Sequence, residues 1–236
     1  GLELGCPSGE QLFLHRQTTV LRERLALLGD PDGERRGELQ HLYGASLPRP
    51  PRPSDRLHRG GSAVELQWLQ LLDLLHACMH STMLGEEGLR HSTYMHAHGT
   101  STPQNRVTES AIMSELAQAF DVPQFTIAAI KSYLGHSLAP AGGDQLAAIL
   151  GAWQDGIIPG IKTIDHIADD VAQDRLHFPM RDQERDMDSM RGAFVNSKGF
   201  GGNNATGFFM SPQQTEQMLE KRYGTKALTA AKRRQE

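Results

Sequence analysis

The sequence predicts a layered α/β domain, and two observations support this prediction. First, short apolar segments that suit buried strands alternate with longer segments that have helical spacing. Second, three loops rich in glycine and polar residues follow such apolar segments, and the ends of strands in α/β sheets are where ligand sites gather. These features all lie within residues 61–236, which we therefore assign to one domain.

Residues 1–60 differ in character from the rest of the chain. Two short helical patterns, the first with Leu21, Leu25 and Leu28 at i, i+4 and i+7, are separated by the breaker "GDPDG". The segment "SLPRPPRPSDRLHRGGS" follows, and its prolines lack the N–H group that regular structure uses. We predict a helical appendage or insertion at 1–60 that includes a proline-rich linker.

From residue 61 onward the expected elements follow in order. "AVELQWLQLLDLLHACMHSTML" has the leucine spacing of a buried helix, and "STYMHAH" reads as a strand that ends at a glycine turn. "TESAIMSELAQAF" is an amphipathic helix with Ile112, Leu116 and Phe120 at i, i+4 and i+8. "FTIAAI" is a compact apolar run typical of a buried strand, and it leads into the loop "KSYLGHS".

The last third of the chain contains a further helix and two strands. The helix at about 140–154 should place Leu146, Ile149, Leu150 and Trp153 on one face, with a proline tolerated near its start. "RDQERDMDSM" reads as a polar loop. "GAFVNSKGFGGNNATGFFM" has the pattern of two strands joined by a glycine-rich turn.

Composition excludes several classes of protein. The 236 residues are 38 % hydrophobic and 22 % charged, as in ordinary globular domains, and a net charge of −4 does not suit a nucleic-acid binder. No apolar run is long enough to span a membrane. Cys6 and Cys78 make no disulfide framework, so we expect a reducing, cytoplasmic location. Because the sequence begins at Gly1 rather than Met, we also expect it to start inside a longer protein.

Three loops carry the candidate functional residues: "HAHGTSTP" at 96–103, "KSYLGHS" at 131–137 and "NSKGFGGNNA" at 196–205. Each loop alone has an ordinary structural interpretation. His98 could be a turn histidine, Lys131 a surface lysine, and "GFGG" a tight hairpin. Their combination and order are more specific than any one of them.

In this order the loops resemble the C-terminal half of the β-ketoacyl-acyl carrier protein synthases, condensing enzymes of the thiolase-like fold. That family carries "HGTxTP", "KSxxGH" and "NSxGFGGxN", and this chain has "HGTSTP", "KSYLGH" and "NSKGFGGNN". The resemblance covers about residues 65–212. It implies half of a layered αβαβα fold, a homodimer, and malonyl and acyl thioesters delivered by acyl carrier protein. It implies no metal or diffusible cofactor, because the phosphopantetheine belongs to the carrier protein.

The resemblance also implies a catalytic set of four residues. His98 and His136 would be the two catalytic histidines, and neutral imidazole can donate one N–H to an enolate oxygen while its other nitrogen is held. The helix that follows His136 would favour its uncharged form. Lys131 and Glu109 would form a buried pair that organises the loops; their ordinary alternatives are a surface lysine and a first-turn acid.

Five further residues would contact the substrate. Thr100 and Thr102 match positions that hydrogen-bond the phosphopantetheine arm. Phe200, between Gly199 and Gly201, matches a position whose backbone N–H helps to form the oxyanion hole and whose ring gates the acyl pocket. The ordinary alternative for Phe200 is core packing, against which the flanking glycines argue.

The resemblance does not extend to the family's nucleophile, a cysteine at a strand-to-helix elbow. Cys6 precedes a proline near the start of the chain, and Cys78 lies in a leucine-rich helix that suits an inert buried thiol. Arg106 stands where many members have an acid, and Lys198 where many have an aromatic residue. We therefore expect this chain alone to be inactive, as the C-terminal portion of a longer synthase.

Two other classes of function stay open from sequence. One is a non-catalytic partner subunit of a condensing enzyme, although such partners often lose the histidines that are present here. The other is a metal hydrolase that uses His91, His96 and His98. No nearby acid completes that metal site, and it leaves Gly99 and the two threonines unexplained.

Overall fold

The structure, a computed structural model, describes residues 84–199 and 204–234. The predicted appendage at 1–60, the leucine-rich helix that follows it and both cysteines lie outside these residues. Phe200 and Gly201 lie outside them as well. The domain boundary after residue 60 therefore stays a prediction.

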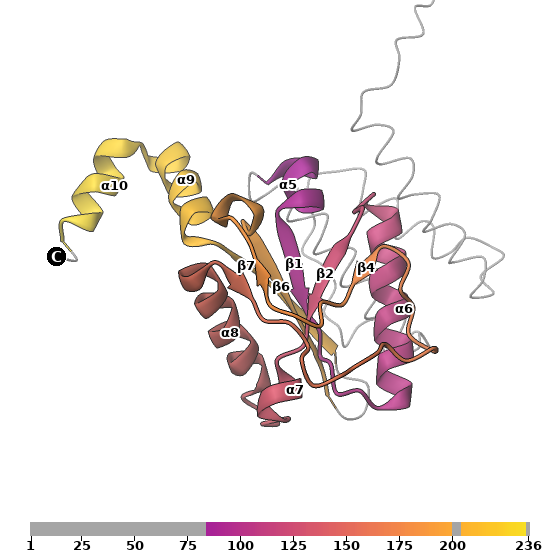
Figure 1. Ribbon diagram of the computed structural model, residues 1–236. Helices are drawn as coiled ribbons and strands as arrows, with labels where there is room; N and C mark the ends of the chain where they lie inside the picture. Colours follow the sequence, from indigo (N-terminus) through magenta and orange to yellow (C-terminus); the bar gives the residue numbers. More distant parts are fainter. Residues whose placement is uncertain (1–83, 200–203, 235–236) are drawn as a thin grey trace, which may run out of the picture. The chain divides into compact units, whose positions relative to one another are not determined.

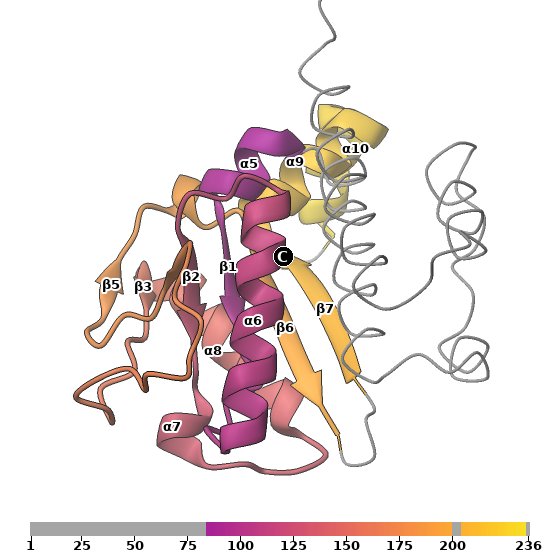
Figure 2. The same ribbon diagram turned by 90° about the vertical axis from the view of Figure 1, so that its right-hand side faces the viewer.

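A five-stranded sheet with the order β4-β2-β1-β6-β7 forms the centre of the fold (Figures 1 and 2). Its strands are β1 (Thr93–His96), β2 (Phe125–Ala128), β4 (Leu176–His177), β6 (Gly192–Lys198) and β7 (Asn204–Met210). The first four in spatial order are parallel, and β7 runs antiparallel to β6. Parallel pairing places the carboxyl ends of β1, β2 and β6 at one edge of the sheet, where ligand sites gather.

Two long helices cover opposite faces of this sheet (Figures 1 and 2). They are α6 (Pro103–Ala119) and α8 (Ala141–Asp155). The shorter helices are α5 (Gly85–His91), α7 (Lys131–Leu134), η1 (Met187–Ser189), α9 (Pro212–Tyr223) and α10 (Thr225–Lys232). A small second sheet pairs β3 (Ile157–Ile158) with β5 (Gln183–Glu184). None of the helices in the described ranges is long and apolar enough to cross a membrane.

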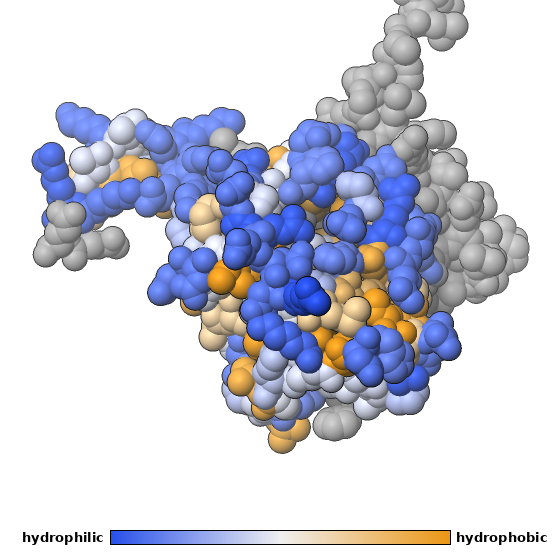
Figure 3. All heavy atoms as spheres, viewed as in Figure 1, coloured by the Kyte–Doolittle hydropathy of each residue, from blue (hydrophilic) through white to orange (hydrophobic). Residues whose placement is uncertain are grey.

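The hydrophobic core on one side of the sheet lies under α8. Tyr94 and Val195 project from β1 and β6 toward Ile149 and Trp153 of the helix. The Trp153 indole N–H donates to the backbone oxygen of Met190 at 2.7 Å, which satisfies the polar atom of this buried ring. The molecule is mostly hydrophilic on the face shown in Figure 3, with apolar patches between the charged residues.

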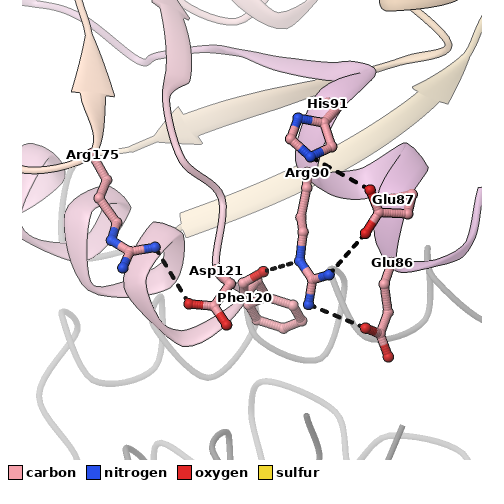
Figure 4. Close-up of polar contacts among 7 residues, drawn as sticks. All are labelled: Glu86, Glu87, Arg90, His91, Phe120, Asp121 and Arg175. Atoms are coloured by element: carbon pink, nitrogen blue, oxygen red, sulfur yellow. Dashed lines mark hydrogen bonds and ion pairs between the residues drawn. The ribbon is translucent and has the colours of Figure 1, made fainter. Parts of the chain in front are cut away.

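Ion pairs and hydrogen bonds close the opposite edge of the sheet, at the amino end of β1 (Figure 4). Arg90 of α5 donates to the backbone oxygen of Phe120, just after α6, at 3.0 Å, and it pairs with Glu86 and Glu87 at 3.1 Å. Arg175 pairs with Asp121 at 3.5 Å. These contacts hold the end of α6 against the start of the sheet, so that its other end faces the carboxyl edge.

The predicted strands in "STYMHAH", "FTIAAI" and the paired "GAFVNSKGFGGNNATGFFM" are all confirmed. The helix predicted in "TESAIMSELAQAF" is confirmed as α6, which begins earlier, at Pro103. Its predicted apolar face is buried, with Ile112, Leu116 and Phe120 no more than 1 % exposed.

Other predictions need correction. In α8, Leu150 is 55 % exposed, because the buried stripe runs through Gln145, Ile149 and Ala152 and turns Leu150 toward solvent. "KSYLGHS" is not simply a loop, since its first residues form the helical turn α7. "RDQERDMDSM" is not an open polar loop, because it contains β5 and η1 and ends at the fully buried Met190.

Gly160 lies where the chain passes very close to another backbone segment. An added Cβ there would lie 2.2 Å from the carbonyl carbon of Arg181. We expect Gly160→Ala to lower the free energy of unfolding by about 1–3 kcal/mol. The matched change Gly151→Ala, inside α8 with no described atom within 4 Å of the new Cβ, should raise it by about 0.5–1 kcal/mol. Denaturant unfolding measures both, and equal stability of the two variants would contradict the prediction.

Candidate active site

The two predicted catalytic histidines come together at the carboxyl edge of the sheet. His98 follows β1, and His136 follows the α7 turn that comes after β2. Their ring centroids are 5.1 Å apart, with the ring planes at 78°. Two residues that are 38 positions apart in the sequence therefore form a pair of imidazoles, as the resemblance implied.

The His98 ring is held in one orientation by β6. Its Nδ1 accepts the backbone N–H of Lys198 at 3.1 Å, which places the ring hydrogen on Nε2. Burial lowers the pKa of His98 to about 4, and the positive charge of Lys131 acts in the same direction. The neutral ring is thus an N–H donor at ordinary pH.

The His136 ring has a similar hydrogen-bond arrangement. Its Nδ1 accepts the backbone N–H of Leu138 at 3.0 Å, which leaves Nε2 to carry the hydrogen. His136 is exposed, and α8 begins five residues later at Ala141. The structure therefore provides two imidazoles that each use Nδ1 as an acceptor from the backbone and keep Nε2–H available.

A small cavity of about 260 Å³ lies beside the two rings. Ser197, Lys198 and Gly199 at the end of β6 form part of its wall, together with Gly142 of α8. Gly199 thus lies where the resemblance places the oxyanion region, while its predicted companions Phe200 and Gly201 are outside the described residues. Lys198, which stands where many members of the family have an aromatic residue, is part of this lining.

A larger cavity of about 620 Å³ lies between the "HGTSTP" loop, α7 and the segment after β3. Thr100, Lys131 and His136 line it on one side, and apolar side chains such as Ile164 and Phe178 line another. Thr102, the second threonine predicted to bind phosphopantetheine, is exposed at the start of α6 and does not line this cavity. The structure thus places only Thr100 in a cavity wall.

Glu109 is the centre of the hydrogen bonds under the site. Its carboxylate accepts the backbone N–H groups of His98 at 2.7 Å and Gly99 at 3.1 Å. It also accepts the side-chain amides of Asn105 at 3.0 Å and Asn196 at 2.6 Å. Glu109 is only 4 % exposed and lies in the second turn of α6, not in its first turn. Sequence reasoning missed both asparagines, whose only signal is their place in the motif loops.

The direct ion pair predicted between Lys131 and Glu109 is wrong. Lys131 is buried, at 8 % exposure, but its Nζ has no hydrogen-bond partner in the described part of the chain. Four N–H groups already occupy the Glu109 oxygens, so the carboxylate acts on the lysine only through longer-range attraction. Burial lowers the pKa of Lys131, and attraction to Glu109 and Asp144 opposes that shift in part.

The hypothesis of a metal site with His91, His96 and His98 is not supported by the arrangement of these residues. His91 lies beside Glu87 at the opposite edge of the sheet (Figure 4). His96 is fully buried against the Tyr94 ring, with 5.6 Å between the ring centroids. Within residues 84–199 and 204–234, no three His, Cys, Asp or Glu side chains are grouped as metal ligands.

Comparison with known proteins supports the resemblance inferred from the three loops. Residues 77–165 match the family model of the beta-ketoacyl synthase C-terminal domain. The predicted similarity to the C-terminal half of the β-ketoacyl synthases is confirmed. The β-ketoacyl-[acyl-carrier-protein] synthase FabY of Pseudomonas aeruginosa is 51 % identical over 148 residues, which are 63 % of this chain and 23 % of that protein. The 3-oxoacyl-[acyl-carrier-protein] synthase 2 of a Synechocystis species is 32 % identical over 123 residues, 48 % of this chain and 26 % of that protein.

A solved structure supports the same assignment. The crystal structure of the noncanonical ketosynthase FabY from P. aeruginosa matches 70 % of this chain and 25 % of its own, with a TM-score of 0.66 and 46 % identity. The predicted thiolase-like fold, in its C-terminal half, is confirmed. The chain spans about a quarter of the length of the curated relatives it matches.

The buried neutral His96 predicts how the stability of the domain depends on pH. Burial lowers the pKa of His96 from 6.5 to about 4. The unfolded chain binds this proton near pH 6.5 and the folded chain does not, so the free energy of unfolding falls as the pH falls from 6.5 to 4. His96→Met should reduce this slope by about 1.4 kcal/mol per pH unit. Denaturant unfolding across this range measures the slope, and an unchanged slope would contradict the prediction.

Because Glu109 accepts four hydrogen bonds and Lys131 makes none with the described residues, we expect mutation of the two residues to change the free energy of unfolding differently. Glu109→Gln should lower the free energy of unfolding by about 3 kcal/mol, because a side-chain amide turns its own N–H groups toward buried donors. Lys131→Met should leave stability unchanged or raise it, because it removes a buried ammonium group that has no hydrogen-bond partner within residues 84–199 and 204–234. Unfolding experiments on both variants test this, and a loss of similar size in Lys131→Met would show that the lysine has a partner in solution.

Proposed function

We propose that the protein takes part in the decarboxylative Claisen condensation of acyl and malonyl thioesters on acyl carrier protein, in fatty-acid or related acyl-chain synthesis. This chain supplies the half of the site that contains the two histidines. The observation that carries the proposal is the His98–His136 pair, in which each Nδ1 accepts a backbone N–H and each Nε2 keeps its hydrogen.

The chemistry of decarboxylation requires such donors. Loss of CO₂ from a malonyl thioester leaves an enolate, whose negative charge develops on the thioester oxygen. Two N–H groups that are already in place stabilise this charge without reorganising during the reaction. The low pKa of His98 keeps that ring neutral. His98 is therefore already in the neutral form, in which Nδ1 accepts from the backbone and Nε2–H donates.

The other parts of the reaction are proposed from the resemblance. The phosphopantetheine arm of the carrier protein approaches along Thr100 and Thr102, and the backbone around Gly199 to Gly201 contributes to an oxyanion hole. The nucleophilic cysteine comes from another part of the synthase, and this chain alone does not condense. Both histidine donors are present, which argues against a non-catalytic partner subunit. The homodimer and the cytoplasmic location stay predictions.

The test removes each donor in the complete synthase. His98→Ala and His136→Ala should each lower the rate of malonyl-thioester decarboxylation by about 10²–10³. Transfer of the acyl group to the nucleophile should fall less, because it forms no malonyl enolate. The matched control is His91→Ala, which removes an exposed histidine at the opposite edge of the sheet and should leave both rates unchanged. Decarboxylation at the wild-type rate in both site variants would reject the two-histidine mechanism.

A further inference from the structure

A buried glutamine joins the two strands that carry the site. Gln145 is fully buried in the second turn of α8. Its Nε2 lies 2.8 Å from the backbone oxygen of Ala97 and 3.2 Å from those of His96 and Asn196. Its side chain therefore links the carboxyl end of β1 with that of β6, directly beside the last paired residues His96 and Val195.

The environment determines which way the Gln145 amide points. The nitrogen faces three carbonyl oxygens, and the oxygen accepts the hydroxyl of Ser197 at 3.4 Å. With the amide flipped, its oxygen would face those three acceptors and no donor. The site thus requires a neutral group that donates hydrogen, and a carboxylate cannot replace it.

The peptide bond before His98 is held from both faces of the sheet. Gln145 of α8 binds the carbonyl of Ala97, and Glu109 of α6 binds the N–H of His98 at 2.7 Å. Asn196 is held in the same manner, with its carbonyl on Gln145 and its side-chain amide on Glu109. The two helices lie on opposite sides of the sheet (Figure 2), so the peptide cannot move toward either one without breaking a bond.

We propose that Gln145 is a positioning residue for His98. Its amide fixes the peptide that precedes the histidine and holds the end of β6 beside it. In this way it preserves the bond from the Lys198 N–H to Nδ1, which directs Nε2–H toward the substrate. The effect on reaction rate rests on the function proposed above, whereas the effect on the geometry of His98 does not.

Two variants in the complete synthase test the proposal. Gln145→Met keeps the size of the side chain and removes the donor. It should lower kcat for malonyl decarboxylation by about 10- to 100-fold, as expected for a catalytic group displaced by about 1 Å, while KM changes by less than about twofold. An unchanged kcat with a raised KM would overturn the proposal, because a displaced His98 must slow the chemical step.

Gln145→Glu provides a reversible test within one folded protein. Burial and three facing carbonyl oxygens raise the pKa of a carboxyl group at this position, so that it becomes protonated in mild acid and can donate again. The activity of Gln145→Glu relative to wild type should therefore rise at least about fivefold between about pH 8 and about pH 6. Relative activity of Gln145→Met should stay flat, and a flat profile for Gln145→Glu as well would overturn the proposal.

Gln154 provides the matched control, because it is an exposed glutamine on the same helix. Gln154→Met and Gln154→Glu should match wild type in kcat, KM and pH profile. Crystal structures of wild type and Gln145→Met separate this proposal from the proposed function. A lost or lengthened contact between His98 Nδ1 and the Lys198 nitrogen supports positioning even if the wild-type synthase does not decarboxylate malonyl thioesters. An unchanged contact overturns positioning even if the His98→Ala result confirms the function.

Discussion

The Glu109 carboxylate is the interaction on which the rest of the site depends. It accepts N–H groups from the loop after β1, from the start of α6 and from β6, and so joins three segments of the sheet edge. Each hydrogen bond to a charged group stabilises the fold by about 1.5–3 kcal/mol. Four such bonds stabilise it more than one ion pair with a buried lysine does, because desolvation of the two charges offsets most of their attraction. This comparison explains why the carboxylate binds these N–H groups and why Lys131 has no direct partner among the described residues.

The buried Lys131 affects the pKa values of two neighbouring histidines. Together with burial, its positive charge lowers the pKa of both His96 and His98 to about 4. Lys198 acts on His98 in the same direction. The region is thus biased toward neutral imidazole and toward negative charge on a bound molecule, which are the two conditions that enolate stabilisation requires. A buried lysine can in this way favour the chemistry proposed above.

Much of the fold was predictable because its signals are local. Apolar runs of strand length, such as that at Phe125, and helical spacing, such as that of Ile112 and Leu116, depend only on neighbouring residues. The prediction failed for α8, where Leu150 was expected inside. Hydrophobicity suggested that Leu150 is buried, but the buried face of α8 contains Gln145, whose amide donates to the backbone oxygen of Ala97. The burial of Gln145 could not be predicted from the residues around it in the sequence, because the three carbonyl groups that it contacts lie about 50 residues away along the chain.

The sequence by itself determined the resemblance to the β-ketoacyl synthases, the order of the three loops and the candidate residues His98, His136, Lys131 and Glu109, because each motif is continuous in the chain. Only the tertiary structure decided which of them touch. In the structure the ring centroids of the two histidines are 5.1 Å apart, and the Glu109 carboxylate accepts hydrogen bonds from Asn105 and Asn196. Gln145 links the ends of β1 and β6. The physical reason is that a buried polar atom bonds to whichever partners the packed strands present, and parallel strand pairing presents partners about 50 to 90 residues away along the chain.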